Sequence, residues 1–119
     1  MNVNIGNGGR EISWSSGGKK IVKSYSDRLL GYEVLPDEAG IILLEPTSHA
    51  GVENAIIYGV DGAKLWQLPF PPDLGKGQLF DRVGISQGDL VVIGIINGRD
   101  VKFTVDYTNL RYIDASATR

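Results

Sequence analysis

The sequence predicts an all-β domain, an antiparallel meander of hairpins packed as a sandwich or as a partly closed small barrel. Short runs of β-branched, aliphatic and aromatic residues recur along the chain, and turn-forming residues separate them. Glycine accounts for 16 of 119 residues, which fits many tight turns between short strands. No window of about a dozen residues has the apolar spacing of an amphipathic helix. We therefore expect eight to ten short strands in a single domain that spans residues 1–119.

The clearest hairpin lies at residues 90–107. An apolar run at residues 90–96 meets Asn97-Gly98, the pair that best tolerates the positive φ angles of a two-residue hairpin turn. The return strand, residues 101–107, alternates between apolar and polar residues. The first strand is apolar on both of its faces, which predicts a central strand that is covered on both sides.

Turn signals divide the rest of the chain into further strands. Pro36 and Gly40 mark one hairpin turn, and Asp61-Gly62 is a second candidate for a two-residue turn. Residues 69–77 are rich in proline and glycine and form the longest predicted loop. The other expected strands are residues 11–14, 20–25, 28–35, 41–45, 55–60, 63–68, 79–85 and 110–114.

These patterns also predict which parts of the chain are loosely ordered and which residues form the core. Residues 1–9 are rich in glycine and residues 115–119 follow the last strand, so we expect both ends to be loosely ordered. The core is expected to contain Val34, Leu43, Ile57, Leu65, Val92, Ile95, Val101, Phe103 and Val105.

Composition argues against several classes of protein. The net charge is −2, and acidic and basic residues are interspersed, so nothing suggests a nucleic-acid-binding surface. The chain has no cysteine, which removes disulfides and thiolate chemistry. Its apolar runs are much shorter than the roughly 18 residues that a membrane helix needs. No basic segment followed by an apolar one opens the chain, so we expect a cytoplasmic protein without a membrane partner.

Candidate catalytic residues are sparse. His49 is the only histidine, and it could act as a general base for Ser48 with Glu53 as the orienting carboxylate. These residue types are common in loops, and no Gly-x-Ser-x-Gly motif supports the assignment. Most aspartates lie in predicted turns, where they hydrogen-bond nearby backbone. We therefore expect no catalytic residue, no metal site and no cofactor.

Aromatic residues near the predicted 55–68 hairpin are the best binding candidates. Trp66 lies on its second strand, and Phe70 follows in a loop stiffened by three prolines, where an aromatic side chain could serve as a rigid anchor. Tyr58 and Lys64 lie on the same hairpin. Trp66 is more consistent with a core position, whereas Phe70 fits a core plug and an exposed anchor equally well.

The leading functional hypothesis is a non-enzymatic protein–protein interaction module, for example an immunity-type or antitoxin-like partner of another protein. The alternative is a domain that binds a small molecule or carbohydrate, with Trp66, Tyr58 and Phe70 stacking on the ligand. A hydrolase that uses acid–base chemistry is a distant third. Homodimer formation through a sheet edge or an apolar face is also expected.

Overall fold

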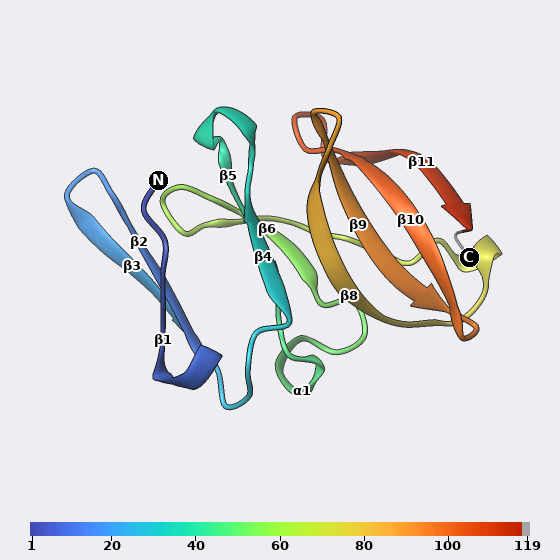
Figure 1. Cartoon of the computed structure of the whole chain (residues 1–119), viewed down its shortest axis with the longest axis horizontal. Helices are drawn as coiled ribbons and strands as arrows, with labels where there is room; N and C mark the ends of the chain where they lie inside the picture. Colours follow the sequence, from blue (N-terminus) through green and yellow to red (C-terminus); the bar gives the residue numbers. More distant parts are fainter. Residues whose placement is uncertain (118–119) are drawn as a thin grey trace.

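The computed structural model describes residues 1–117 and consists of three antiparallel β-sheets that follow one another along the molecule (Figure 1). The predicted all-β fold is confirmed, and within residues 1–117 the sheets stay open and form no closed barrel. The three sheets pack as consecutive layers, with the middle sheet between the other two. The protein is therefore a sandwich of hairpins with one layer more than a simple two-sheet sandwich.

Each sheet is a meander of neighbouring strands. The N-terminal sheet contains β1 (Asn4–Gly6), β2 (Glu11–Ser16) and β3 (Lys19–Ser24). The middle sheet contains β4 (Gly31–Val34), β5 (Gly40–Leu44), β6 (Ala55–Gly59) and β7 (Lys64–Gln67). The C-terminal sheet has the order β11-β10-β9-β8 and contains β8 (Gly77–Ser86), β9 (Asp89–Ile96), β10 (Arg99–Asp106) and β11 (Arg111–Ala117).

Short helical turns connect some of these strands. They are η1 (Asn7–Gly9), η2 (Pro36–Glu38), α1 (Thr47–Ala50) and η3 (Pro72–Leu74). The described part of the chain has eleven strands, one more than the upper end of the expected range. The additional strand is β1, a short segment that pairs antiparallel with β2 in the region we expected to be loosely ordered.

The middle sheet is covered on both faces. Every residue of β5 and β6 is buried, although sequence analysis assigned that role to residues 90–96. One face, which includes Ile42 and Ile57, packs on the C-terminal sheet at Phe103. The opposite face packs on the N-terminal sheet, where Trp14 is buried. Burial on both faces explains why the two strands are almost entirely apolar.

Strand β9 is central in its own sheet, but only one of its faces reaches the core. Leu90, Val92 and Ile96 are buried, whereas the alternate residues on the other face are half-buried. A hydrogen bond from Arg82 on β8 to Asp100 on β10 spans β9, because these two strands flank it. Long side chains from neighbouring strands thus shield the outer apolar face in place of another layer.

The predicted turns form hairpins, but one turn is longer than expected. Asn97 and Gly98 have φ angles of 51° and 76°, and they join Ile96 to its partner Arg99, which confirms the two-residue turn. The β6–β7 turn instead has three residues, 60–62, because the Gly59 N–H donates to the Ala63 carbonyl at 2.9 Å. Positive φ occurs at its last residue, Gly62.

Leu65 was expected in the core, and this prediction is wrong. Ile57 pairs with Trp66 while the next residue, Tyr58, pairs with Lys64, so Leu65 is an extra residue in a β-bulge. Its side chain is 48% exposed. The other expected core residues are buried or half-buried, and Val34, Ile95 and Val101 are among the half-buried ones.

The C-terminal end of the chain also departs from a simple expectation. Residues 115–117 belong to β11 and pair with β10, whereas residues 118 and 119, also expected to be loosely ordered, lie outside the described residues. Within the described range, the helices are too short to cross a membrane.

Candidate functional site

The four residues proposed for binding do not share one surface. Tyr58 pairs with Lys64, and Tyr58 packs in the cluster between the middle and N-terminal sheets. Trp66 pairs with Ile57, and Trp66 and Phe70 pack against the cluster between the middle and C-terminal sheets. Tyr58 and Lys64 therefore lie on one face of the middle sheet, whereas Trp66 and Phe70 lie on the side of its opposite face.

Phe70 is packed on the C-terminal sheet. Its ring stacks on Phe80 with centroids 4.2 Å apart and an interplanar angle of 3°. Gly77 and Gly94 lie beneath the ring, and a Cβ atom at either position would collide with it. Its backbone N–H donates to the Glu53 carboxylate at 2.7 Å. These contacts give Phe70 the geometry of a core plug, with part of the ring still accessible.

Trp66 is half-buried beside the last strand. Its ring lies 5.4 Å from that of Tyr112 on β11. The Tyr112 hydroxyl donates to the Pro69 carbonyl at 2.6 Å, which fixes the start of the proline-rich loop. Burial, and secondarily the negative charge of Glu53, raises the pKa of Tyr112. Lys64, on the opposite face, is exposed and donates to the Gln67 side chain at 2.8 Å.

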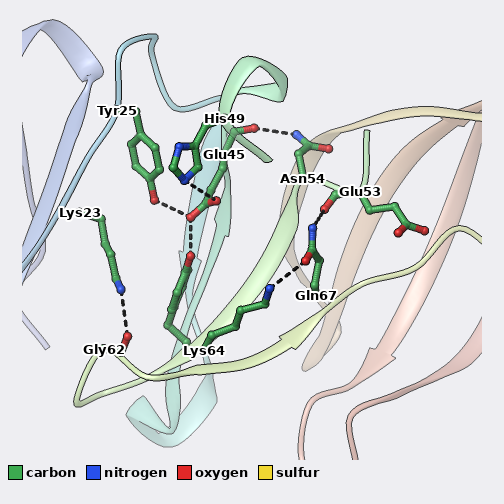
Figure 2. A network of polar contacts seen from close by, with 10 residues as sticks. Lys23, Tyr25, Glu45, His49, Glu53, Asn54, Gly62, Lys64 and Gln67 are labelled. Atoms are coloured by element: carbon green, nitrogen blue, oxygen red, sulfur yellow. Dashed lines mark hydrogen bonds and ion pairs between the residues drawn. The ribbon is translucent and has the colours of Figure 1, made fainter. Parts of the chain in front are cut away.

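The strongest polar cluster surrounds Glu45, at the end of β5 (Figure 2). Its side chain is only 2% exposed, and Oε2 accepts hydrogen bonds of 2.5 Å from the hydroxyls of both Tyr25 and Tyr58. Burial raises the pKa of each tyrosine, and the hydrogen bond to Glu45 raises it further. The buried carboxylate thus ties the segment after β3 to the middle sheet.

His49 lies at the edge of this cluster and does not form the Ser48–His49–Glu53 arrangement that sequence analysis considered and did not favour. Its Nε2 atom is 3.9 Å from Oε1 of Glu45, and its side chain is 56% exposed. The Ser48 hydroxyl donates to Asp27, while Glu53 accepts the Phe70 N–H. The structure therefore does not connect Ser48, His49 and Glu53 through hydrogen bonds.

Sequence analysis missed Glu45 altogether. A carboxylate directly after a five-residue apolar strand and before Pro46 was the available signal, since a charge in that position is usually buried with partners. Asn54 has a related linking role toward the C-terminal sheet. Its side chain bonds to the Glu45 carbonyl and to both backbone groups of Phe80, at 2.7–2.9 Å, and so links the middle sheet to β8.

A groove on the C-terminal sheet is the main candidate site for binding. It consists of three adjoining hollows of about 350, 480 and 560 Å³. The first and second share Leu74 and Ala115, and the second and third share Asn97. The groove thus runs from Tyr112 along β11 to Ala117, and then past the β9–β10 turn at Asn97 to the start of β8 and Val52.

Small side chains on β11 keep this groove open. Ala115 and Ala117 pair with Phe103 and Val101, so they lie on the inner face of the sheet, yet they are too small to fill the space beside Leu74. Leu74, in η3, is 39% exposed. The proline-rich loop thereby forms one wall of the groove, and β11 forms the other.

Strand β11 lies at one edge of its sheet, so its outer edge has no neighbouring strand within residues 1–117. Ile113 is the extra residue of a bulge, because Thr104 pairs with Asp114 and Val105 pairs with Tyr112. Ile113 is 61% exposed. A groove with both apolar and charged lining residues therefore adjoins an open strand edge.

The described residues contain no cluster of three or more histidine, aspartate or glutamate side chains that could hold a metal ion. Comparison of the chain with protein-family models, with curated protein sequences and with solved structures finds no match. The groove and the strand edge beside it are therefore the features from which a function can be proposed.

Proposed function

We propose that this chain is a non-enzymatic protein-binding domain and that its contact surface is the groove between β11 and the proline-rich loop. The observation that carries the proposal is a groove with apolar and charged lining residues beside an open strand edge. Surfaces that bind other proteins commonly combine an apolar centre with a polar rim. Open strand edges offer unpaired backbone donors and acceptors to a second chain.

The groove is held in shape before any partner arrives. The Asn97 side chain accepts the Lys76 N–H at 3.0 Å, and the Asn97 N–H donates back to the Lys76 carbonyl at 3.0 Å. The Gly98 N–H donates to the Gln78 side chain at 2.6 Å. Together with the Tyr112–Pro69 hydrogen bond, these contacts fix both walls, which lowers the entropy lost on binding.

Such a contact would suit the immunity-type or antitoxin-like role that the sequence suggested, in which the domain blocks its partner by occupying it. A small-molecule carrier is the alternative, because a 480 Å³ hollow is large enough for a small ligand. However, Trp66, Tyr58 and Phe70 do not line the hollows described above. The groove therefore favours a protein partner over stacking on a small ligand.

Site-specific photo-crosslinking tests the proposal. A photoreactive amino acid replaces Leu74 in one variant and Val22 in another, because these side chains have similar exposure, 39% and 45%. Leu74 lies in η3 beside the groove, whereas Val22 lies in β3 of the N-terminal sheet. Crosslinking is carried out in the cytoplasmic fraction of source cells, the compartment that the sequence predicts. We expect one protein to be captured in stoichiometric amount through position 74 and not through position 22. If neither position captures a protein and a small molecule binds in the groove, the result would support the carrier instead.

A further inference from the structure

We propose that the groove takes an extended segment of the partner, which adds to β11 as an antiparallel strand with an acidic N-terminal end and a basic C-terminal end. This inference depends on the proposed function and specifies the chemistry of the partner. It is carried by the open edge of β11, by the hollow beside Ala115 and Ala117, and by the charged residues that line the groove.

The open edge of β11 determines the conformation of the occupant. Its outer backbone groups have no neighbouring strand in the described range, and an added strand would satisfy them with regular ladder hydrogen bonds. Antiparallel addition gives slightly more stable pairing than parallel addition. Residues on one face of the added strand would then recur every second position, in step with Ala115 and Ala117. The hollows beside these alanines can take β-branched or aliphatic side chains.

The charges along the groove determine the direction of the occupant. Asp73 and Asp114 line the hollow near Tyr112, at the start of β11. Arg99 lines the next hollow, where β11 ends. An antiparallel strand begins beside the end of β11, so its N-terminal residues would face this cation. Its C-terminal residues would face the two carboxylates, which gives the charge order proposed above.

A second copy of this chain is a poorer occupant. Full antiparallel overlap of β11 (Arg111–Ala117) with its own copy places Asp114 of one chain directly opposite Asp114 of the other. Like charges in directly opposed positions destabilise a strand pair. The same register also brings Arg111 of the copy to the end of β11 that Arg99 lines. The charge pattern therefore favours a different chain.

Peptide binding tests this inference. The probe is a terminally blocked seven-residue peptide in which valine alternates with threonine between an N-terminal glutamate and a C-terminal lysine. NMR titration of the labelled protein measures its affinity, and hydrogen exchange measures protection of β11 amides. A control peptide has the glutamate and the lysine exchanged. We expect the first peptide to bind, to slow exchange in β11 and to bind at least about tenfold more tightly than the control.

Two variants locate the contact. Ala115→Ile fills the hollow beside Leu74 and keeps a good strand residue, so the fold should persist while the peptide binds at least about tenfold more weakly. Ser116→Ile is the matched control, because Ser116 pairs with Lys102 on the opposite face of the sheet. Affinity should be unchanged in this control.

Several results would overturn the inference. Equal binding of the charge-exchanged peptide, or undiminished binding to Ala115→Ile, would contradict it. A dimer in analytical ultracentrifugation that Ala115→Ile dissociates would identify a second copy as the occupant. If no peptide binds but position 74 still crosslinks one partner, strand addition is wrong and the protein-binding function stands. If neither occurs, both proposals fail.

Discussion

Strands β5 and β11 differ in burial and in how many of their edges are paired. Every residue of β5 is buried, and neighbours cover its faces and both of its edges. In β11, six of the seven residues are exposed, Tyr112 is half-buried, and one edge is open in the described part of the chain. The contrast indicates that the middle sheet carries the stability of the fold, while the last strand is available for contact.

Chemistry also differs between the two faces of the middle sheet. Toward the C-terminal sheet the contact is aromatic, with Phe80 and Phe103 at a centroid distance of 5.7 Å and Phe70 stacked on Phe80. Toward the N-terminal sheet the contact includes the buried Glu45 carboxylate with its two tyrosine donors. Both faces must stay packed for the middle sheet to hold, so substitutions there should cost far more than substitutions on β11.

The largest expected loss of stability comes from Phe80→Ala. The side chain is fully buried and contacts two other phenylalanine rings, so its removal leaves a large cavity and should cost about 3–5 kcal/mol. Ile113→Ala, at the 61% exposed bulge of β11, should change stability by less than about 0.5 kcal/mol. Urea unfolding of both variants measures the difference, and similar losses would contradict the contrast between core and edge.

The second-largest loss of stability, about 2–4 kcal/mol, should come from Glu45→Ala, because two buried tyrosine hydroxyls lose their acceptor. Glu45→Gln keeps an oxygen acceptor and should lose less. Thermal unfolding of both variants gives the comparison. If Glu45→Ala were no less stable than Glu45→Gln, the carboxylate would not hold the N-terminal sheet in the way described.

Gly94→Ala should cost about 1–3 kcal/mol through overpacking. A Cβ atom at this position would lie 2.8 Å from the Phe70 ring and 3.0 Å from the Phe80 ring. Gly84→Ala is the control, since no other atom lies within 4 Å of the corresponding Cβ position. Denaturation midpoints measure the difference, and equal midpoints would show that Phe70 is not packed on β9 as described.

Alkaline pH should weaken the fold through the buried tyrosines. The pKa values of Tyr25, Tyr58 and Tyr112 are raised above the ordinary value of 10.0. Their stabilising contribution is therefore complete below pH 10 and is lost as pH rises, because the unfolded chain releases protons that the folded chain retains. The loss is up to about 1.4 kcal/mol per pH unit for each tyrosine. Ultraviolet titration should show these three ionising only as the protein unfolds, and ionisation before unfolding would contradict their burial.

Local sequence signals predicted much of the fold. Asn97-Gly98 specified its turn because the two-residue hairpin needs positive φ at both positions, which these residues tolerate. The β6–β7 turn was misjudged by one residue, and the bulge in β7 then exposed Leu65, because a single extra residue changes which face a side chain occupies. The doubly covered strands were also misassigned, since apolar runs at residues 40–44 and 90–96 look alike in sequence. Which run lies in the middle layer depends on long-range packing.

The candidate site was harder to predict. Trp66, Phe70 and Tyr58 were chosen for their aromatic chemistry, but packing places them on opposite faces of the middle sheet. The groove depends instead on Leu74 and on two alanines, whose importance comes from the space that small side chains leave open. An absence of side-chain volume has no recognisable motif. Only the register between β10 and β11 brings those alanines beside the loop.

Native-state hydrogen exchange tests the central contrast most directly, because it measures the opening free energy of each strand separately in the unbound protein. Amides of β5 and β6 should exchange only through global unfolding. Amides of β11 should exchange through local opening, at a free energy at least about 2 kcal/mol lower. Equal opening free energies for β5 and β11 would contradict the proposed contrast between the two strands, because the last strand would then be as firmly held as the middle of the fold.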